Sequence, residues 1–249
     1  KKKKMYNYFN FPIAMLQDAF KIINYDERYY KKQLFEDIIL ICCYRYLKDN
    51  NLKINFENIR EAGNYFKIEL HYSVAQFKER GSELYYKHYG YSAENKIAPV
   101  GIQKKILYDF LENDKSEQEV ITLLMFLAIK SIIGPKDKVK KTNNNFVFSR
   151  MAGFNSSIDD FSELPAYLIK YTKRYQRDKL IKELKLNWGL KYYSLHNRGF
   201  YVSFKMTDKA LSKYATKRKE SNQLKKIKLE QERGREEALH EMLVDSLFK

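Results

Sequence analysis

The stretch RYQRDKLIKELKLNWGLKYYSLHNRGFYVSFK, residues 174–205, decides how the rest of the chain is interpreted. Its first part has the spacing of a short helix, because Leu180, Ile181 and Leu184 fall on one side at about 100° per residue. Basic residues occupy another side, and Arg177 borders the apolar one. The apolar side must pack against another element, so the basic side is expected to face outward.

Two short extended runs follow this helix. Residues 190–193 are apolar and aromatic, and residues 200–205 alternate with the period of a half-buried strand. Asn197 and Gly199 suit the turn between them. A helix followed at once by a two-stranded ribbon is typical of a winged-helix unit, whose helix enters the major groove. Two plainer interpretations stay open: a solvated surface helix, and a hairpin that only caps a helical core.

The residues before this stretch supply the other helices of such a unit. Ser116 and Glu119 form a capping box in front of a very apolar segment, residues 117–133, which is expected to be the buried first helix. Gly134 and Pro135 end it. Residues 136–141 (KDKVKK) are expected to form a basic loop.

A second short helix is expected after that loop, capped by Thr142 or Asn143 and running to about Met151. The Phe-Val-Phe triplet at 146–148 also fits a strand. The spacer up to Arg174 is longer than a minimal helix-turn-helix needs. It leaves open whether residues 165–173 or 174–186 face the groove, or whether both belong to one bent helix.

The N-terminal half is expected to be a helical module. Asn10 is a suitable cap and Pro12 suits a first turn, so a helix is predicted from there. Further helices are predicted over residues 31–48 and 56–66, from Ser73 with a break at Gly81, and from Pro99 to Leu111.

Few residues in this module indicate chemistry. Cys42 and Cys43 lie in its most apolar helix and point in different directions, so they are expected to be core thiols. His71 and His88 lack further ligands nearby. Tyrosines interleave with basic residues over residues 72–91, which fits half-buried packing and, as the alternative, a stacking surface for single strands.

Composition limits the classes of function. The 249 residues carry 47 Lys and Arg against 31 Asp and Glu, a net charge of +16, which favours polyanions as partners. Abundant Lys, Asn, Ile and Tyr are also typical of AT-rich genomes, so part of this charge need not be functional. Two cysteines make no disulfide framework, which fits a reducing cytoplasm. No apolar run approaches the roughly 20 residues of a membrane span.

Residues 207–249 differ in composition from the rest. The first part, to about Lys228, is strongly basic and is expected to be an exposed helix or a tail that orders on contact. The end regains apolar residues at helical spacing, which suit docking on a partner or a second copy, or folding back onto the N-terminal helices. This candidate partner-binding stripe comprises Leu239, Met242, Leu243 and Leu247.

Common catalytic motifs are missing from the sequence. It has no GxxxxGK[ST] loop, no GxSxG elbow, no HExxH and no CxxC. The four histidines are scattered, and the acidic residues show no spacing typical of a two-metal site. We therefore expect a protein that is not an enzyme, with no cofactor and no metal.

The segment from about Glu117 to Lys205 contains LAIKSIIG, FVFSRMAGF, LIKYTKRYQRDKLIKEL and NWGLKYYSLHNRGFYVSF. In this layout it resembles the winged-helix region of proteins carried on bacterial plasmids, phages and other mobile elements, of the replication-initiator or regulator kind. The resemblance implies duplex DNA binding, with groove contacts from Arg174, Arg177, Lys182 and Lys185, and a wing contact from Arg198. The long spacer before Arg174 departs from that family's compact pattern.

We predict a mostly α protein with a small β-hairpin: a helical module (5–113), a winged helix-turn-helix unit (114–206) and a basic helix or tail (207–249). The predicted function is duplex DNA binding in regulation of transcription or replication of a mobile element. The alternatives are an RNA- or ribonucleoprotein-binding module and a non-enzymatic subunit of an assembly. The candidate nucleic-acid-binding residues are Asn143, Asn144, Arg150, Arg174, Arg177, Lys179, Lys182, Lys185, Lys191 and Arg198.

Overall fold

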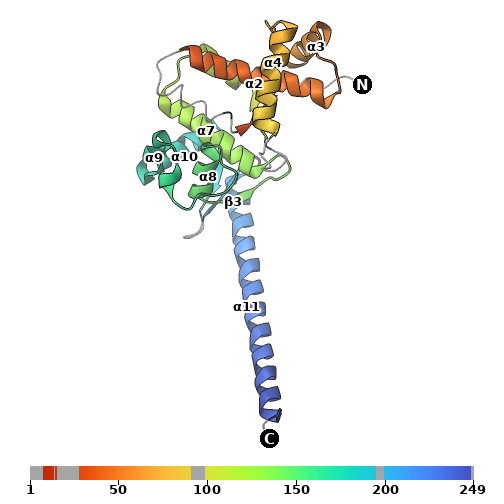
Figure 1. Ribbon diagram of the computed structural model, residues 1–249. Helices are drawn as coiled ribbons and strands as arrows, with labels where there is room; N and C mark the ends of the chain where they lie inside the picture. Colours follow the sequence, from red (N-terminus) through yellow and green to blue (C-terminus); the bar gives the residue numbers. More distant parts are fainter. Residues whose placement is uncertain (1–7, 14, 16–27, 91–98, 195–198, 248–249) are drawn as a thin grey trace.

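The computed structural model describes residues 8–13, 15, 28–90, 99–194 and 199–247 (Figure 1). Over these ranges the chain is mostly helical, with two small antiparallel sheets and a long C-terminal helix, so the predicted fold class is confirmed. Among the helices of the described ranges, none is both long enough and apolar enough to cross a membrane.

Three helices dominate the N-terminal half. They are α2 (Arg28–Asp49), α3 (Phe56–Phe66) and α4 (Val74–Tyr85), and a short π-helix, η2 (Tyr86–Gly90), follows α4. The helices predicted over 31–48 and 56–66 are confirmed. Asn55 caps α3 by accepting from the backbone N–H of Asn58, and Ser73 opens α4 with a capping box.

Gly81 does not interrupt α4, contrary to the sequence prediction. A Cβ at Gly81 would overlap the ring carbon Cδ2 of Tyr44 on α2. The glycine therefore allows α4 to approach α2 closely, and the packing gained outweighs the poor helix propensity of glycine.

The helices predicted to start at Asn10 and at Pro99 are wrong at these positions. Strand β1 (Tyr8–Pro12) pairs antiparallel with β2 (Pro99–Gln103), and α6 (Lys104–Glu112) begins only after it. The side chains of Phe9 and Phe11 are buried while those of Tyr8 and Asn10 are exposed, as in a half-buried strand. Most of the predicted first helix, residues 14 and 16–27, lies outside the described residues.

The second half contains, in order, α7 (Glu117–Ile133), β3 (Lys140–Thr142), α8 (Asn144–Met151), the 3-10 turn η3 (Phe161–Glu163), α9 (Ala166–Thr172), α10 (Arg174–Asn187), β4 (Lys191–Tyr193) and β5 (Phe200–Ser203). The strands form one antiparallel sheet in the order β3-β5-β4. The order of α7, α8 and α10 before the β4–β5 hairpin follows the sequence prediction. The β4–β5 hairpin was predicted; β3 was not, because Lys140 and Lys141 were assigned to a loop.

Helix α7 connects the two halves of the molecule. It is buried along most of its length and packs against α8 and α10 of the second half and against β2 of the first. The ammonium of Lys130 donates a hydrogen bond of 2.7 Å to the carbonyl of Gly101 on β2. One continuous core of buried side chains therefore runs through both halves.

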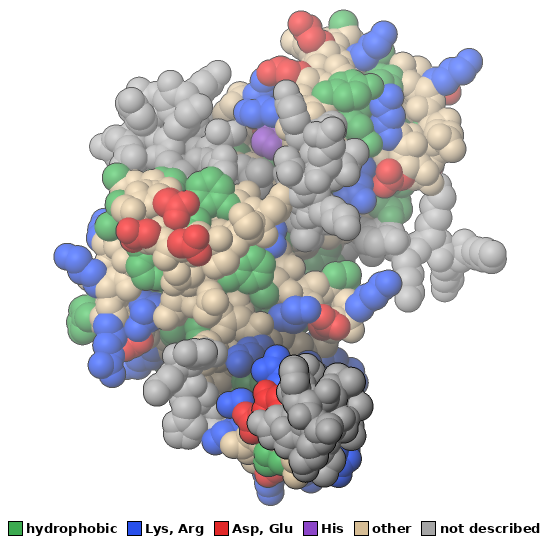
Figure 2. Space-filling view, turned by 60° about the horizontal axis from the view of Figure 1, so that its bottom comes forward, with side chains coloured by type: hydrophobic (Ala, Val, Ile, Leu, Met, Phe, Trp, Pro, Cys, Tyr) green, Lys and Arg blue, Asp and Glu red, His purple; other side chains and the backbone are tan. Residues whose placement is uncertain are grey.

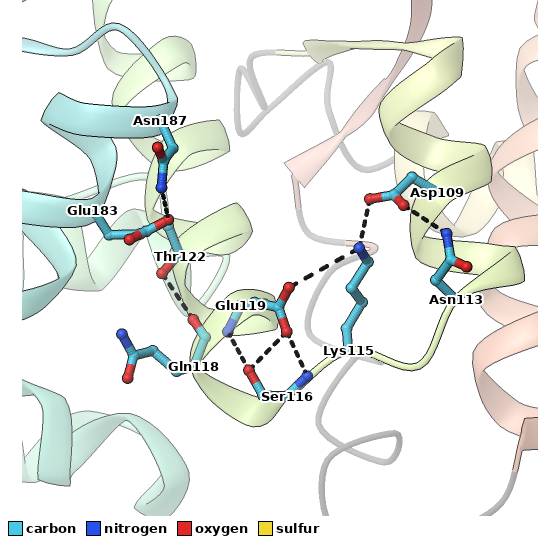
Figure 3. Close-up of polar contacts among 9 residues, drawn as sticks. All are labelled: Asp109, Asn113, Lys115, Ser116, Gln118, Glu119, Thr122, Glu183 and Asn187. Atoms are coloured by element: carbon cyan, nitrogen blue, oxygen red, sulfur yellow. Dashed lines mark hydrogen bonds and ion pairs between the residues drawn. The ribbon is translucent and has the colours of Figure 1, made fainter.

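Polar contacts secure the start of α7 (Figure 3). The predicted capping box is present: the carboxylate of Glu119 accepts from the N–H and the hydroxyl of Ser116, both at 2.8 Å. Lys115 forms an ion pair of 2.6 Å with Asp109 on α6. The connection between α6 and α7 is thus held by charge as well as by the cap.

The C-terminal helix α11 (Asp208–Leu247) projects away from the body as a single rod (Figure 1). Only its first two turns pack on the sheet, where Leu211 and Ala215 cover Tyr201. For this reason every residue of β5 is buried, although the alternating pattern predicted one solvated face. The projection also rules out folding back of this segment onto the N-terminal helices.

Candidate nucleic-acid interface

Helix α10 is separate from α9. Lys173 between them has an extended backbone, with φ −59° and ψ 137°, so the two are not one bent helix. At the other end, the carbonyl of Leu184 accepts from the N–H groups of Trp188 and Leu190, at 3.1 and 3.0 Å. Gly189, with φ +70°, makes this turn possible. The end of α10 is thereby connected directly to β4.

The two sides of α10 differ as the sequence predicted. Leu180 and Leu184 are fully buried, Ile181 is half-buried, and the helix packs on α7. The basic side chains on the outer side are all exposed. They belong to Arg174, Lys179, Lys182 and Lys185, which we call the α10 basic face.

Few acidic groups neutralise this face. Asp178 lies 3.8 Å from Arg174 and 3.8 Å from Arg177, in solvent-exposed pairs that contribute little free energy. Arg177 is the less exposed of the two arginines, as its place beside the apolar side predicted. Among the residues that the structure describes, no carboxylate lies within 4.0 Å of the three lysines of the α10 basic face. These ammonium groups are available to phosphate.

Two exposed residues on α10 were not among the predicted contacts. The side chain of Tyr175 is 78 % exposed, beside Arg174 in the first turn, and that of Leu186 is 69 % exposed. The sequence could have predicted that Tyr175 is exposed, because helical spacing places Tyr175 about 140° around the helix from the buried Leu180. A tyrosine at this position can contact sugar or base edges.

The prediction that Arg150 is a nucleic-acid-binding residue is wrong. Its side chain turns inward and the residue is only 7 % exposed. The guanidinium donates to the side-chain oxygen and the carbonyl of Asn155, at 3.0 and 3.3 Å, and lies over the ring of Phe146. Burial lowers the pKa of this guanidinium. Arg150 holds the loop after α8 and cannot reach a ligand at the surface.

The predicted asparagines lie at the start of α8, which confirms a helix in place of the alternative strand. Asn143 is exposed and caps the helix, its side-chain oxygen accepting from the N–H of Phe146 at 2.8 Å. Asn144 is half-buried. Both amides are near the surface, but that of Asn143 already serves the helix.

Two of the predicted nucleic-acid-binding residues, Lys191 and Arg198, belong to the β4–β5 hairpin. Lys191 forms an ion pair of 3.3 Å with Asp208 in the first turn of α11, so it connects the sheet to that helix. Arg198, at the predicted wing tip, lies outside the described residues. Gly199 was predicted only as a turn residue; a Cβ there would be 2.5 Å from the carbonyl oxygen of Thr142, so it allows β3 to pair beside β5.

The tyrosines of the N-terminal half mainly pack against one another. The ring of Tyr85 lies 5.6 Å from that of Tyr44 and 5.3 Å from that of Tyr89. The ring of Tyr86 also contacts that of Tyr85, at 5.8 Å, although Tyr86 is 59 % exposed; Tyr91 lies outside the described residues. This arrangement favours the packing interpretation over a stacking surface for single strands.

The remaining predictions concern metal-ligating and thiol side chains in the described part of the chain. There, no group of three or more His, Cys, Asp or Glu side chains is placed to hold a metal ion. Cys42 and Cys43 are buried thiols, as predicted. The stripe residues Leu239, Met242, Leu243 and Leu247 lie on the far end of α11, but their side chains are outside the described set.

Comparisons of the chain with protein-family models, with curated proteins and with solved structures gave no match.

Proposed function

We propose that this protein binds duplex DNA, with α10 in the major groove and the β4–β5 hairpin alongside. One observation carries the proposal. The helix directly before the hairpin of a winged helix-turn-helix arrangement exposes four cations opposite its buried leucines, and the three lysines among them have no described acidic partner. A helix in this position is the one that reads the groove in helix-turn-helix proteins.

Each residue has a distinct role in this proposal. Arg174, in the first turn, is placed to reach base edges, because the N-terminal residues of such helices point into the groove. Lys179, Lys182 and Lys185 would neutralise phosphates, which sets affinity and salt dependence but carries no sequence information. Regulation of transcription or replication of a mobile element is the process that we infer from the layout of the winged unit.

The test compares a duplex, a single strand of DNA and an RNA of equal length by fluorescence anisotropy over a salt series. The interface variant is Arg174→Glu/Lys182→Glu/Lys185→Glu. Its matched control is Lys53→Glu/Arg60→Glu/Lys78→Glu, which changes the net charge equally at exposed positions of the N-terminal half. Circular dichroism checks that both variants are folded.

We expect the duplex to bind most tightly and the control to bind nearly as the wild type does. The interface variant should lose binding, because it removes the base contact of Arg174 and the two phosphate contacts of Lys182 and Lys185. The loss of two phosphate contacts should lower the slope of log K against log salt by about 1.8. Arg150→Met should bind DNA like the wild type, since Arg150 is buried. Equal binding of all three ligands, with the interface variant unchanged, would contradict the proposal; tighter RNA binding would favour the ribonucleoprotein alternative.

A further inference from the structure

Most of α11 has no packing partner in the described chain. From Thr216 to Glu237 every side chain is exposed, including Leu224, Ile227 and Leu229, which are 62, 49 and 53 % exposed. Helices in proteins are stabilised mainly by the burial of one face, and isolated helices in water are marginal. Residues 216–237 of α11 therefore lack the buried face that usually stabilises a helix.

Charge along α11 is divided into two halves. Residues 208–228 contain eight basic and two acidic residues, whereas residues 229–247 contain six acidic and two basic residues. The sign changes between Lys228 and Leu229, among the three exposed apolar residues. Figure 2, which looks toward the free end of the rod, shows Lys and Arg side chains on its visible flanks.

Within one helix this division is unfavourable. Lys209, Lys213 and Lys217 follow one another at i, i+4 spacing, and Glu232 and Glu236 do the same. Like charges at this spacing destabilise a helix. The ion pair of 3.6 Å between Lys226 and Glu230 joins opposite charges at the boundary. Opposite charges on another molecule would offset this repulsion between like charges along the whole helix.

We propose that α11 pairs antiparallel with α11 of a second copy of this chain. A two-fold axis near residues 228–229 would lay the basic half of each helix along the acidic half of the other. Such an interface is isologous, because the same surface is used twice. A parallel pair would instead place like charges together.

Two of the three exposed apolar residues, Leu224 and Ile227, fit this arrangement, whereas Leu229 lies on the opposite side of the helix. Leu224, Ile227, Gln231 and Gly234 are spaced by three, four and three, so they share a narrow face that crosses the axis. Gly234 has no atom within 4 Å of where its Cβ would be, which leaves room for close approach of a second helix.

Nucleic acid fits the rod less well than a second copy does. The basic half alone would attract phosphates, but the acidic half would repel them, and Leu224 and Ile227 would stay in water. A second copy satisfies both halves and covers the apolar face. If the proposed DNA binding is also correct, a 40-residue helix of about 60 Å would hold the two winged units further apart than one turn of DNA, about 34 Å.

Sedimentation velocity of the full chain without nucleic acid tests the pairing. The basic-half variant is Lys213→Glu/Lys217→Glu/Lys228→Glu, and the acidic-half variant is Glu230→Lys/Glu241→Lys/Asp245→Lys, all at positions whose spacing places them on or beside the proposed face. We expect a wild-type dimer that weakens with salt, and a Kd raised roughly tenfold or more in each variant alone. An equimolar mixture of the two variants should dimerise again, and the control Lys53→Glu/Arg60→Glu/Lys78→Glu should behave as wild type.

A wild type that stays monomeric at every concentration would overturn the proposal, as would a dimer that neither variant weakens. Orientation is tested with Leu224→Cys and Gly234→Cys, which lie on the proposed face on opposite sides of the axis, since both native cysteines are buried. Oxidation should cross-link a mixture of the two variants and neither one alone; cross-linking of each alone would show a parallel pair. Because no nucleic acid is present, failure here is distinct from failure of DNA binding.

Discussion

The indole ring of Trp188 lies 4.6 Å from the ring of Phe126, between the end of α10 and the middle of α7. Phe126 also contacts Phe204, just after β5, with ring centroids 5.1 Å apart. One side chain of α7 therefore touches both parts of the stretch 174–205. Through this contact α10 and the hairpin are held on the same buried helix, which fixes how the α10 basic face is presented.

Phe126→Ala should lower the free energy of unfolding by about 3–5 kcal/mol, because a large buried ring is lost and a cavity remains. Trp188 is the only tryptophan, so urea unfolding followed by its fluorescence reports on this region. Phe56→Ala is the control, since Phe56 is 66 % exposed and should change stability by no more than about 0.5 kcal/mol. Equal effects of the two substitutions would contradict the packing described.

Two glycines within helices, Gly81 in α4 and Gly234 in α11, should respond in opposite ways to alanine. Gly81→Ala should destabilise the protein by about 1–3 kcal/mol, because the methyl group would meet the ring of Tyr44. Gly234→Ala should instead raise helicity and stabilise α11 by about 1 kcal/mol, since its surroundings are open. Thermal unfolding followed by far-UV circular dichroism measures both. If Gly81→Ala left the thermal stability unchanged, α2 and α4 would be able to move apart without loss of stability.

Glu119 should make stability depend on pH in the acid range. The N–H and the hydroxyl of Ser116 hold the pKa of this carboxyl below its ordinary value of 4.5. Because the pKa is lower in the folded state, the contribution is present above pH 4.5 and is lost as pH falls through the folded-state pKa. The difference in free energy of unfolding between the wild type and Glu119→Gln should therefore become smaller at acid pH.

Urea midpoints for this pair, taken from neutral pH to about pH 3, measure the effect. Glu79→Gln, at an exposed position within α4, serves as the control for loss of one negative charge. If the difference were the same at every pH, the charge of Glu119 would not contribute to the cap.

Both cysteines should be unreactive in the folded protein. Burial raises the pKa of the Cys42 thiol to about 12 and raises that of Cys43 well above its ordinary value. Only the thiolate reacts readily, so a thiol reagent at about pH 8 should modify neither cysteine in buffer and both in denaturant. Fast modification in buffer would show that α2 opens under native conditions.

Local patterns in the sequence were enough for most helices and for the hairpin. Ser116 with Glu119, Ser73 with Gln76, and Asn143 before Phe146 are caps formed by residues three apart, so they need no tertiary contact to be recognised. The division of α10 into a buried and a basic side likewise follows from the 3.6-residue repeat, and the buried leucines confirm it.

The wrong predictions share one cause. Asn10 and Pro99 resembled helix starts, yet each lies in a strand whose partner is about 90 residues away, and no local pattern specifies such a partner. Gly81 resembled a break because its close contact with Tyr44 comes from another helix. Arg150 resembled a surface cation because the chain must fold before Asn155 and Phe146 can enclose it.

The sequence alone therefore determined most of the helices, the hairpin, the basic face of α10 and the charge division of α11, since all depend on residue type and short-range spacing. Only the tertiary structure decided that β3 joins the hairpin, that Arg150 is buried, that Lys191 pairs with Asp208, and that α11 leaves the body. These features depend on which distant surfaces meet, and long-range packing sets that after the local elements have formed.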